Sequence, residues 1–86
     1  MPFRIELSPK AHKQFYILDK PIQQQITKYI NTLAETENPR QRGKPLIGSL
    51  AGIWRYRIGD YRILFRIEDD ILIILVLEIG HRKEVY

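Results

Sequence analysis

Cysteine is absent from this sequence of 86 residues, and histidine occurs only at His12 and His81. Without disulfides the stability has to come from packing, and we expect the chain to fold in a reducing cytoplasm. Two histidines and no cysteine argue against a zinc or haem site. Glycine-rich phosphate loops, Ser-His-Asp sets and paired catalytic carboxylates are missing as well. We therefore expect no metal and no small-molecule cofactor.

Long apolar runs are also missing. The longest, residues 71–77, is far shorter than the roughly 20 residues that span a bilayer. Charges lie among the apolar residues at the N-terminus, so no signal peptide is expected. These features predict a cytoplasmic protein without a membrane partner, folded as one domain over residues 1–86.

Acidic residues are scarce in the middle of the chain, where Asp60 is the sole acid between Arg40 and Arg66. The basic residues of the same stretch are Arg40, Arg42, Lys44, Arg55, Arg57, Arg62 and Arg66. A formal net charge of +4 is modest by itself. Its concentration in one stretch is typical of proteins that bind a polyanion.

The first half of the sequence predicts a strand followed by two helices. Residues 3–7 alternate apolar and charged side chains, the period of a half-buried strand. Ser8 and Pro9 then form an N-cap and a first helical position. Apolar residues at helical spacing follow in two sets: Ala11, Phe15 and Leu18, then Ile22, Ile26, Tyr29, Ile30 and Leu33. Asn38 and Pro39 end the second helix.

The second half predicts a loop and a three-stranded antiparallel meander. Residues 39–52 form an irregular loop, and residues 53–58, 61–67 and 71–79 are the expected strands. Gly59 and Asp60 form a two-residue hairpin turn. The last strand is apolar on both faces and is expected to be central. The predicted fold is α+β, in the order β-α-α-β-β-β, with a helical hairpin packed on a small, mainly antiparallel sheet.

Strand alternation predicts that four arginines share one face of this sheet. Trp54, Tyr56 and Tyr61 are expected in the core, which leaves a set of basic side chains on the opposite face: Arg55, Arg57, Arg62 and Arg66. The guanidinium fork matches phosphate oxygens. The alternative is an ordinary solvated face, on which Asp60, Glu68 and Glu78 neutralise the arginines. Few acids lie nearby, so we favour binding of RNA, to which Arg42 and Lys44 of the loop are predicted to contribute.

Three segments resemble the RelE/ParE superfamily of bacterial toxins: LAGIWRYR at 50–57, GDYRILF at 59–65 and IGHRKEVY at 79–86. The resemblance covers nearly the whole chain and is stronger to the RelE side, whose members cleave messenger RNA in the ribosomal A site. The ParE side inhibits DNA gyrase. The resemblance implies the toxin of a type II toxin–antitoxin system, with a cognate antitoxin, the ribosome and messenger RNA as partners.

The resemblance also implies site residues. Residues to which the RelE side attributes catalysis match Arg55, Arg57, Arg62, Arg82 and Tyr86. At the first two positions lysine is familiar in the family, and this chain has arginine, which stays charged.

The expected reaction is metal-free attack of the 2′-hydroxyl on the adjacent phosphate. Arg62 and Arg82 would clamp the phosphate, while Arg55 and Arg57 would hold the RNA backbone and share the charge stabilisation. Tyr86 would stack on a base, orient the 2′-hydroxyl or serve as acid or base. His81 either acts as general acid or base, or points away from the site. Two other functions stay open: a gyrase inhibitor, and an RNA-binding homologue without turnover.

Overall fold

The computed structural model describes residues 3–83 and has the predicted order of elements. Strand β1 (Arg4–Leu7) leads into helices α1 (Pro9–Tyr16) and α2 (Lys20–Glu35). The meander consists of β3 (Trp54–Ile58), β4 (Tyr61–Glu68) and β5 (Ile73–His81). A fifth strand, β2 (Lys44–Pro45), lies within the segment predicted as a loop, so the sheet order is β1-β5-β4-β3-β2. The predicted α+β fold is confirmed.

Short-range features of the sequence determine where several helices and strands begin or end. The Ala11 N–H donates to the Ser8 hydroxyl at 3.1 Å, which confirms the predicted N-cap of α1. Gly59 has a φ of 58° in the β3–β4 turn, the left-handed region that glycine adopts without strain. Strand β5 begins at Ile73 rather than Ile71, because residues 69–71 form a 3-10 turn and Leu72 has a φ of 54°.

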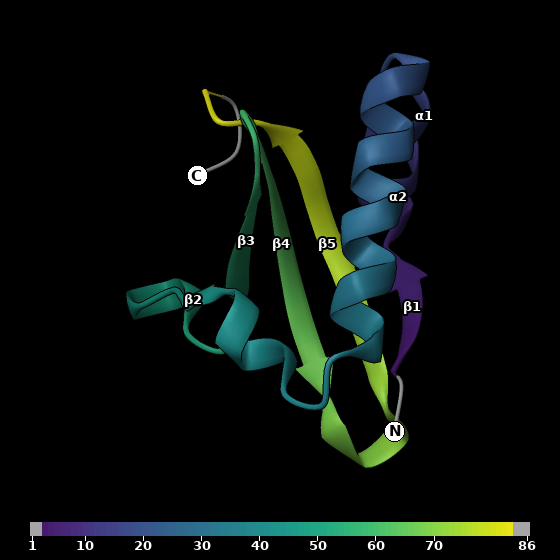
Figure 1. Cartoon of the computed structure of the whole chain (residues 1–86). Coiled ribbons are helices and arrows are strands. Elements are labelled where there is room, and N and C mark those ends of the chain that lie inside the picture. The colour runs from purple at the N-terminus through teal and green to yellow at the C-terminus, as the bar shows by residue number, and fades with distance from the viewer. Residues whose placement is uncertain (1–2, 84–86) are drawn as a thin grey trace.

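The core lies between the helices and one face of the sheet. Figure 1 shows both helices on the same side of the strands. Ile26 and Leu33 of α2 are fully buried against residues of β4 and β5, including Phe65 and Ile74. Strand β5 pairs in parallel with β1 and antiparallel with β4, so it lies inside the sheet as predicted. Burial of these side chains supplies the main stabilisation of the domain.

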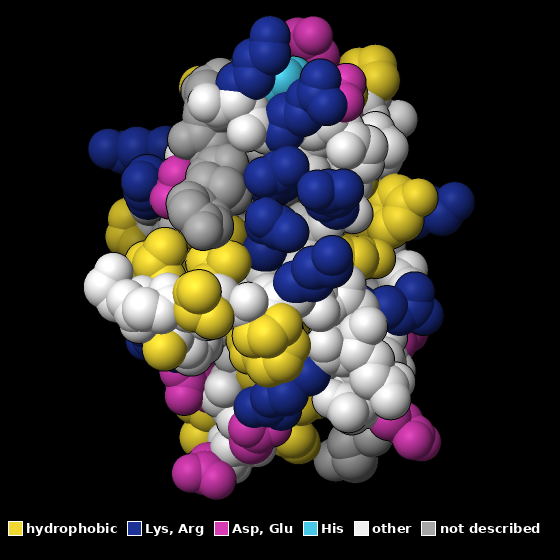
Figure 2. Space-filling model, turned by 90° about the vertical axis from the view of Figure 1, so that its left-hand side faces the viewer, with side chains coloured by type: hydrophobic (Ala, Val, Ile, Leu, Met, Phe, Trp, Pro, Cys, Tyr) yellow, Lys and Arg dark blue, Asp and Glu magenta, His cyan; other side chains and the backbone are white. Residues whose placement is uncertain are grey.

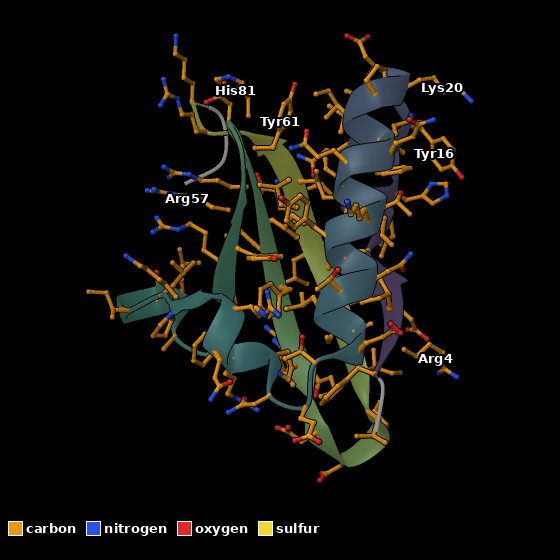
Figure 3. All side chains as sticks on the ribbon, in the orientation of Figure 1. Arg4, Tyr16, Lys20, Arg57, Tyr61 and His81 are labelled. Carbon is orange, nitrogen blue, oxygen red and sulfur yellow. The ribbon has the colours of Figure 1, made fainter. Side chains whose placement is uncertain are left out.

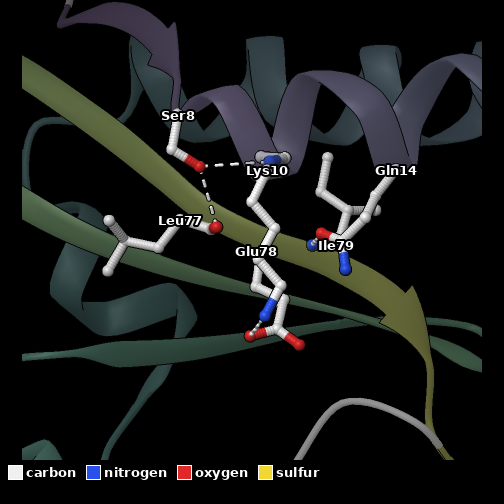
Figure 4. Close-up of polar contacts among 7 residues, drawn as sticks. Ser8, Lys10, Gln14, Leu77, Glu78 and Ile79 are labelled. Carbon is white, nitrogen blue, oxygen red and sulfur yellow. Dashed lines mark hydrogen bonds and ion pairs between the residues drawn. The ribbon is translucent and has the colours of Figure 1, made fainter.

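Helix α1 covers the edge of β5 where β1 has ended. The Ser8 hydroxyl donates to the Leu77 carbonyl at 2.9 Å, and the Ile79 N–H donates to the Gln14 Oε1 at 2.7 Å (Figure 4). Lys10 forms an ion pair with Glu78 at 3.2 Å. Polar side chains of a helix thus satisfy backbone groups that an edge strand would otherwise leave unpaired. The carboxyl end of β5, which leads into Arg82, is fixed in this way.

Candidate nucleic-acid interface

The predicted arginine face exists on the side of the sheet away from the helices. In the β3–β4 pair Arg57 lies directly opposite Arg62, and Arg55 lies opposite Leu64. Figure 3 shows Arg57 pointing away from the helices and Tyr61 pointing toward them. Figure 2 shows this face of the molecule, where lysine and arginine side chains form a column with few acidic groups beside it. We call Arg55, Arg57, Arg62 and Arg82 the arginine cluster.

A groove beside the cluster brings in the basic residues of the loop. It has a volume of about 220 Å³, and its lining consists of Gln41, Arg42, Gly43, Lys44, Arg55 and Arg57. Lys44 pairs with Arg55 across β2 and β3. Arg42 and Lys44, which the sequence predicts to bind RNA, thus lie beside Arg55 and Arg57. Strand β2, which was not predicted, is what brings them there.

Gly43 permits this close approach. A Cβ at this position would lie 2.9 Å from the Arg55 carbonyl oxygen and 3.2 Å from Cζ of Phe65. Any side chain here would push β2 away from β3, because backbone atoms cannot yield as a flexible side chain does. Gln41 and Gly43 were not predicted as site residues. The one available signal was a glycine between two basic residues, in the segment Arg42 to Lys44.

Arg62 lies among like charges. Its partial burial lowers its pKa, and the neighbouring guanidiniums of Arg55, Arg57 and Arg82 lower it further. Its Nε is enclosed and has no hydrogen-bond partner among residues 3–83. Like charges placed opposite each other on a sheet destabilise it. An anion bound here would remove this repulsion and satisfy the free donors.

Acidic side chains do not neutralise the cluster within the part of the chain that the structure describes. The ion pairs there are Arg4–Glu6, Lys10–Glu78 and Arg40–Asp69. Glu78, one of the acids considered as a partner for the arginines, is therefore engaged by α1. Over residues 3–83, no ion pair joins the arginine cluster to Asp60, Glu68 or Glu78.

Arg82 and Arg66 differ in their relation to Arg62. The Arg82 N–H donates to the Asp60 carbonyl at 2.8 Å, which ties the end of β5 to the β3–β4 turn and brings the Arg82 charge near Arg62. Arg66 is on the same face but four residues further along β4, a distance of about 13 Å. Leu64, which stands between Arg62 and Arg66 in β4, belongs to a small apolar cluster with Leu46, Leu50 and Ile53.

His81 lies on the opposite face of the sheet from Arg57 and Arg62. It pairs with Tyr61 across β4 and β5, and the two rings meet edge to face with centroids 5.6 Å apart. Of the two possibilities left open by the sequence, this geometry favours the one in which His81 points away from the site. Tyr86, the remaining predicted site residue, lies outside the described residues.

A bidentate ion pair holds the start of the loop. The Arg40 guanidinium donates to both carboxylate oxygens of Asp69, at 3.1 and 2.6 Å. This hydrogen bonding lowers the pKa of Asp69 and raises the pKa of Arg40. The pair links the 3-10 turn at Pro39–Arg42 to the turn at Asp69–Ile71, next to the groove. Its members are 29 residues apart in sequence, and no local pattern predicts their contact.

Two further observations concern metals and membranes. Across residues 3–83, no three His, Asp or Glu side chains gather as metal ligands would. In the same range, neither helix has the length and apolar character that crossing a bilayer requires.

Comparison with known proteins identifies relatives of the whole chain. A family model described as "ParE toxin of type II toxin-antitoxin system, parDE" matches residues 5–86. The chain is 30% identical to "Toxin RelG" of Mycobacterium tuberculosis over 86 residues, which are 100% of this chain and 98% of the relative.

Solved structures agree with this match. The toxin–antitoxin complex RelBE2 of Mycobacterium tuberculosis contains a chain with a TM-score of 0.86 and 29% identity, covering 95% of this chain and 100% of that one. A chain in the archaeal RelE–RelB complex of Pyrococcus horikoshii has the same fold, with a TM-score of 0.74 and 21% identity over 99% of this chain and 100% of that one.

Proposed function

This chain belongs to the RelE/ParE superfamily of toxins of type II toxin–antitoxin systems, and from this premise we propose that it cleaves messenger RNA on the translating ribosome. The observation that carries the proposal is the arginine cluster. Arg62 is surrounded by Arg55, Arg57 and Arg82, and no acid neutralises them within residues 3–83. Such a concentration of fixed positive charge suits a phosphate whose charge increases during reaction.

The proposed reaction needs only the RNA and these cations. The ribose 2′-oxygen forms a bond to the adjacent phosphorus, and the bond from phosphorus to the 5′-oxygen breaks. The 2′-hydroxyl loses its proton and the 5′-oxygen gains one, which leaves a 2′,3′-cyclic phosphate and a 5′-hydroxyl. Negative charge builds on the equatorial phosphorane oxygens in between. Donors already held at that position stabilise the transition state more than the ground state.

Each member of the site has a proposed role. Arg62 and Arg82 hold the oxygens of the scissile phosphate. Arg57 shares this charge, and Arg55 with Arg42 and Lys44 holds the RNA backbone along the groove. Arg66 contacts a more distant phosphate. Tyr86 stacks on a base or orients the 2′-hydroxyl, as bases in single-stranded RNA allow.

Because the cluster contains arginine in place of lysine, it supplies little general acid–base catalysis. Guanidinium stays protonated in proteins and therefore does not serve as a general base. Positioning of the message can compensate, because holding reacting groups in line removes a large part of the barrier. The proposal therefore includes dependence on the ribosome, and it places the protein in the cytoplasm, where ribosomes are.

A cognate antitoxin is the second partner in this proposal. Some solved relatives are complexes, among them the toxin–antitoxin complex RelBE2 and the archaeal RelE–RelB complex. The arginine cluster fits an acidic segment as well as it fits RNA, since both present oxygens to guanidinium groups. An antitoxin that covers this face would block RNA and remove the charge repulsion at once.

A gyrase inhibitor is the second candidate function, and the matching family model, described as a ParE toxin, favours it. Such a toxin would act through protein contacts and would leave messages intact. In that case the arginine cluster would bind an acidic surface of its target.

Mapping of messenger RNA 5′ ends in cells distinguishes these functions. On induction of the wild type we expect new ends inside translated codons. They should disappear in Arg62→Ala and when initiation of translation is blocked. Growth arrest with intact messages and damaged DNA would establish the gyrase inhibitor instead. Absence of arrest, with RNA binding retained, would indicate a homologue that binds RNA without cleaving it.

A further inference from the structure

At the end of β5, consecutive residues lie on opposite faces of the sheet. Tyr61 and His81 are paired, and their rings meet on the side of the sheet that faces the helices. Gly80 pairs with Arg62 and therefore lies on the arginine face. Arg82 follows His81, and its charge acts on Arg62. The backbone around His81 thus determines how close the Arg82 side chain lies to Arg62.

Two hydrogen bonds fix the turn that follows β5. The Lys83 N–H donates to the Nδ1 of His81 at 3.2 Å. The Arg82 N–H donates to the Asp60 carbonyl at 2.8 Å. A side-chain acceptor that bonds the backbone N–H two residues later is the arrangement by which asparagine and aspartate stabilise turns. Here a histidine supplies the acceptor, so the neutral ring carries its proton on Nε2.

The surroundings of the ring hold it in this orientation. His81 borders a hollow of ≈ 160 Å³, and the other residues that line it are uncharged: Gln14, Ile17, Leu18, Tyr61, Ile79 and Gly80. Gln14 is itself fixed, because its Oε1 accepts from the Ile79 N–H. The Tyr61 ring packs edge to face with the imidazole, with the ring centroids 5.6 Å apart. In this position the ring directs Nδ1 at the Lys83 N–H.

We propose that His81 is a positioning residue, which sets the turn that presents Arg82 to the scissile phosphate, and that it is not a general acid or base. This inference rests on the proposed function, in which Arg82 clamps that phosphate. Two observations carry it: the ring lies on the face opposite Arg57 and Arg62, and its Nδ1 is engaged by the backbone.

Two variants separate the acceptor from the ring. His81→Asn keeps an acceptor for the Lys83 N–H but loses the ring, and His81→Phe keeps a ring against Tyr61 but has no acceptor. Cleavage of a message bound to ribosomes should persist in His81→Asn at more than about a third of the wild-type rate. In His81→Phe the rate should fall about a hundredfold, because a misplaced group loses its alignment with the phosphate.

Amide hydrogen exchange gives a readout that does not depend on cleavage. The Lys83 amide should remain protected in wild type and in His81→Asn, and it should exchange faster in His81→Phe. Thermal unfolding of both variants is the control that tests whether each remains folded. Equal losses of rate in the two variants, as expected for a general acid or base, would overturn the inference, and so would wild-type rates in both.

Failure of the inference and failure of the proposed function are distinguishable. If wild type does not cleave messages, the proposed function fails, and the exchange of Lys83 still shows whether His81 fixes the turn. If wild type cleaves but Lys83 is equally protected in all three proteins, the positioning role of His81 is wrong and the nuclease stands.

Discussion

Arg62→Ala is expected to lower the rate of cleavage on programmed ribosomes by roughly a hundred- to a thousandfold, the loss typical when one donor to a developing oxyanion is removed. The stability of the folded domain should not decrease. Arg62 lies opposite Arg57 and near Arg55 and Arg82, and these neighbours together with partial burial lower its pKa. Removing its charge relieves repulsion, so the midpoint of thermal unfolding should stay the same or rise.

Arg66→Ala is the matched control, since Arg66 lies on the same strand and the same face. It is about 13 Å from Arg62 along the strand, beyond the screening length of about 8 Å at physiological salt. Its loss should affect the half-saturating concentration more than the maximal rate. Comparable losses of maximal rate in both variants would contradict a local clamp at Arg62. So would a wild-type rate in Arg62→Ala.

Phe65→Ala is expected to lower the free energy of unfolding by about 3–5 kcal/mol, the usual cost of removing a large buried ring. Phe65 is fully buried in the core, and its Cζ would lie 3.2 Å from a Cβ on Gly43, which precedes β2. A domain of this size has a total stability of only about 4–13 kcal/mol. The substitution should therefore remove a large share of the total stability and loosen the packing of β2 on the core.

Urea unfolding measures this loss, with Ile47→Ala as the control. Ile47 is apolar and lies in the same segment as β2, but 83% of its surface is exposed. Its replacement should change the free energy of unfolding by less than about 0.5 kcal/mol. A loss below about 1 kcal/mol for Phe65→Ala would mean that the core does not depend on this ring as its burial indicates.

The sequence predicts the arginine face because a strand has only two faces. Once residues 53–58 and 61–67 are assigned as strands joined by Gly59 and Asp60, alternation places Arg57 and Arg62 together. Local signals also define the start of α1 at Ser8 and Pro9. These features depend on residues close in the sequence, so a pattern is sufficient to predict them.

Features that depend on distant contacts could not be predicted. Strand β2 consists of two residues that pair with β3, too short to produce an alternation of their own. A register shift where Leu64 and Phe65 pair with β5 interrupts the strict alternation before His81. The contact of α1 with the edge of β5 arises from Ser8, which the sequence predicts only as an N-cap, and from Gln14, which has no distinguishing signal in the sequence.

Analysis of the ends produced by the purified protein tests the central claim most directly. A labelled message bound to ribosomes is incubated with wild type and with Arg62→Ala, and the termini of the fragments are determined. Our account predicts fragments with a 2′,3′-cyclic phosphate and a 5′-hydroxyl from wild type, and almost none from the variant. Fragments that carry 5′-phosphates, or an intact message under conditions where wild type binds the ribosome, would contradict it.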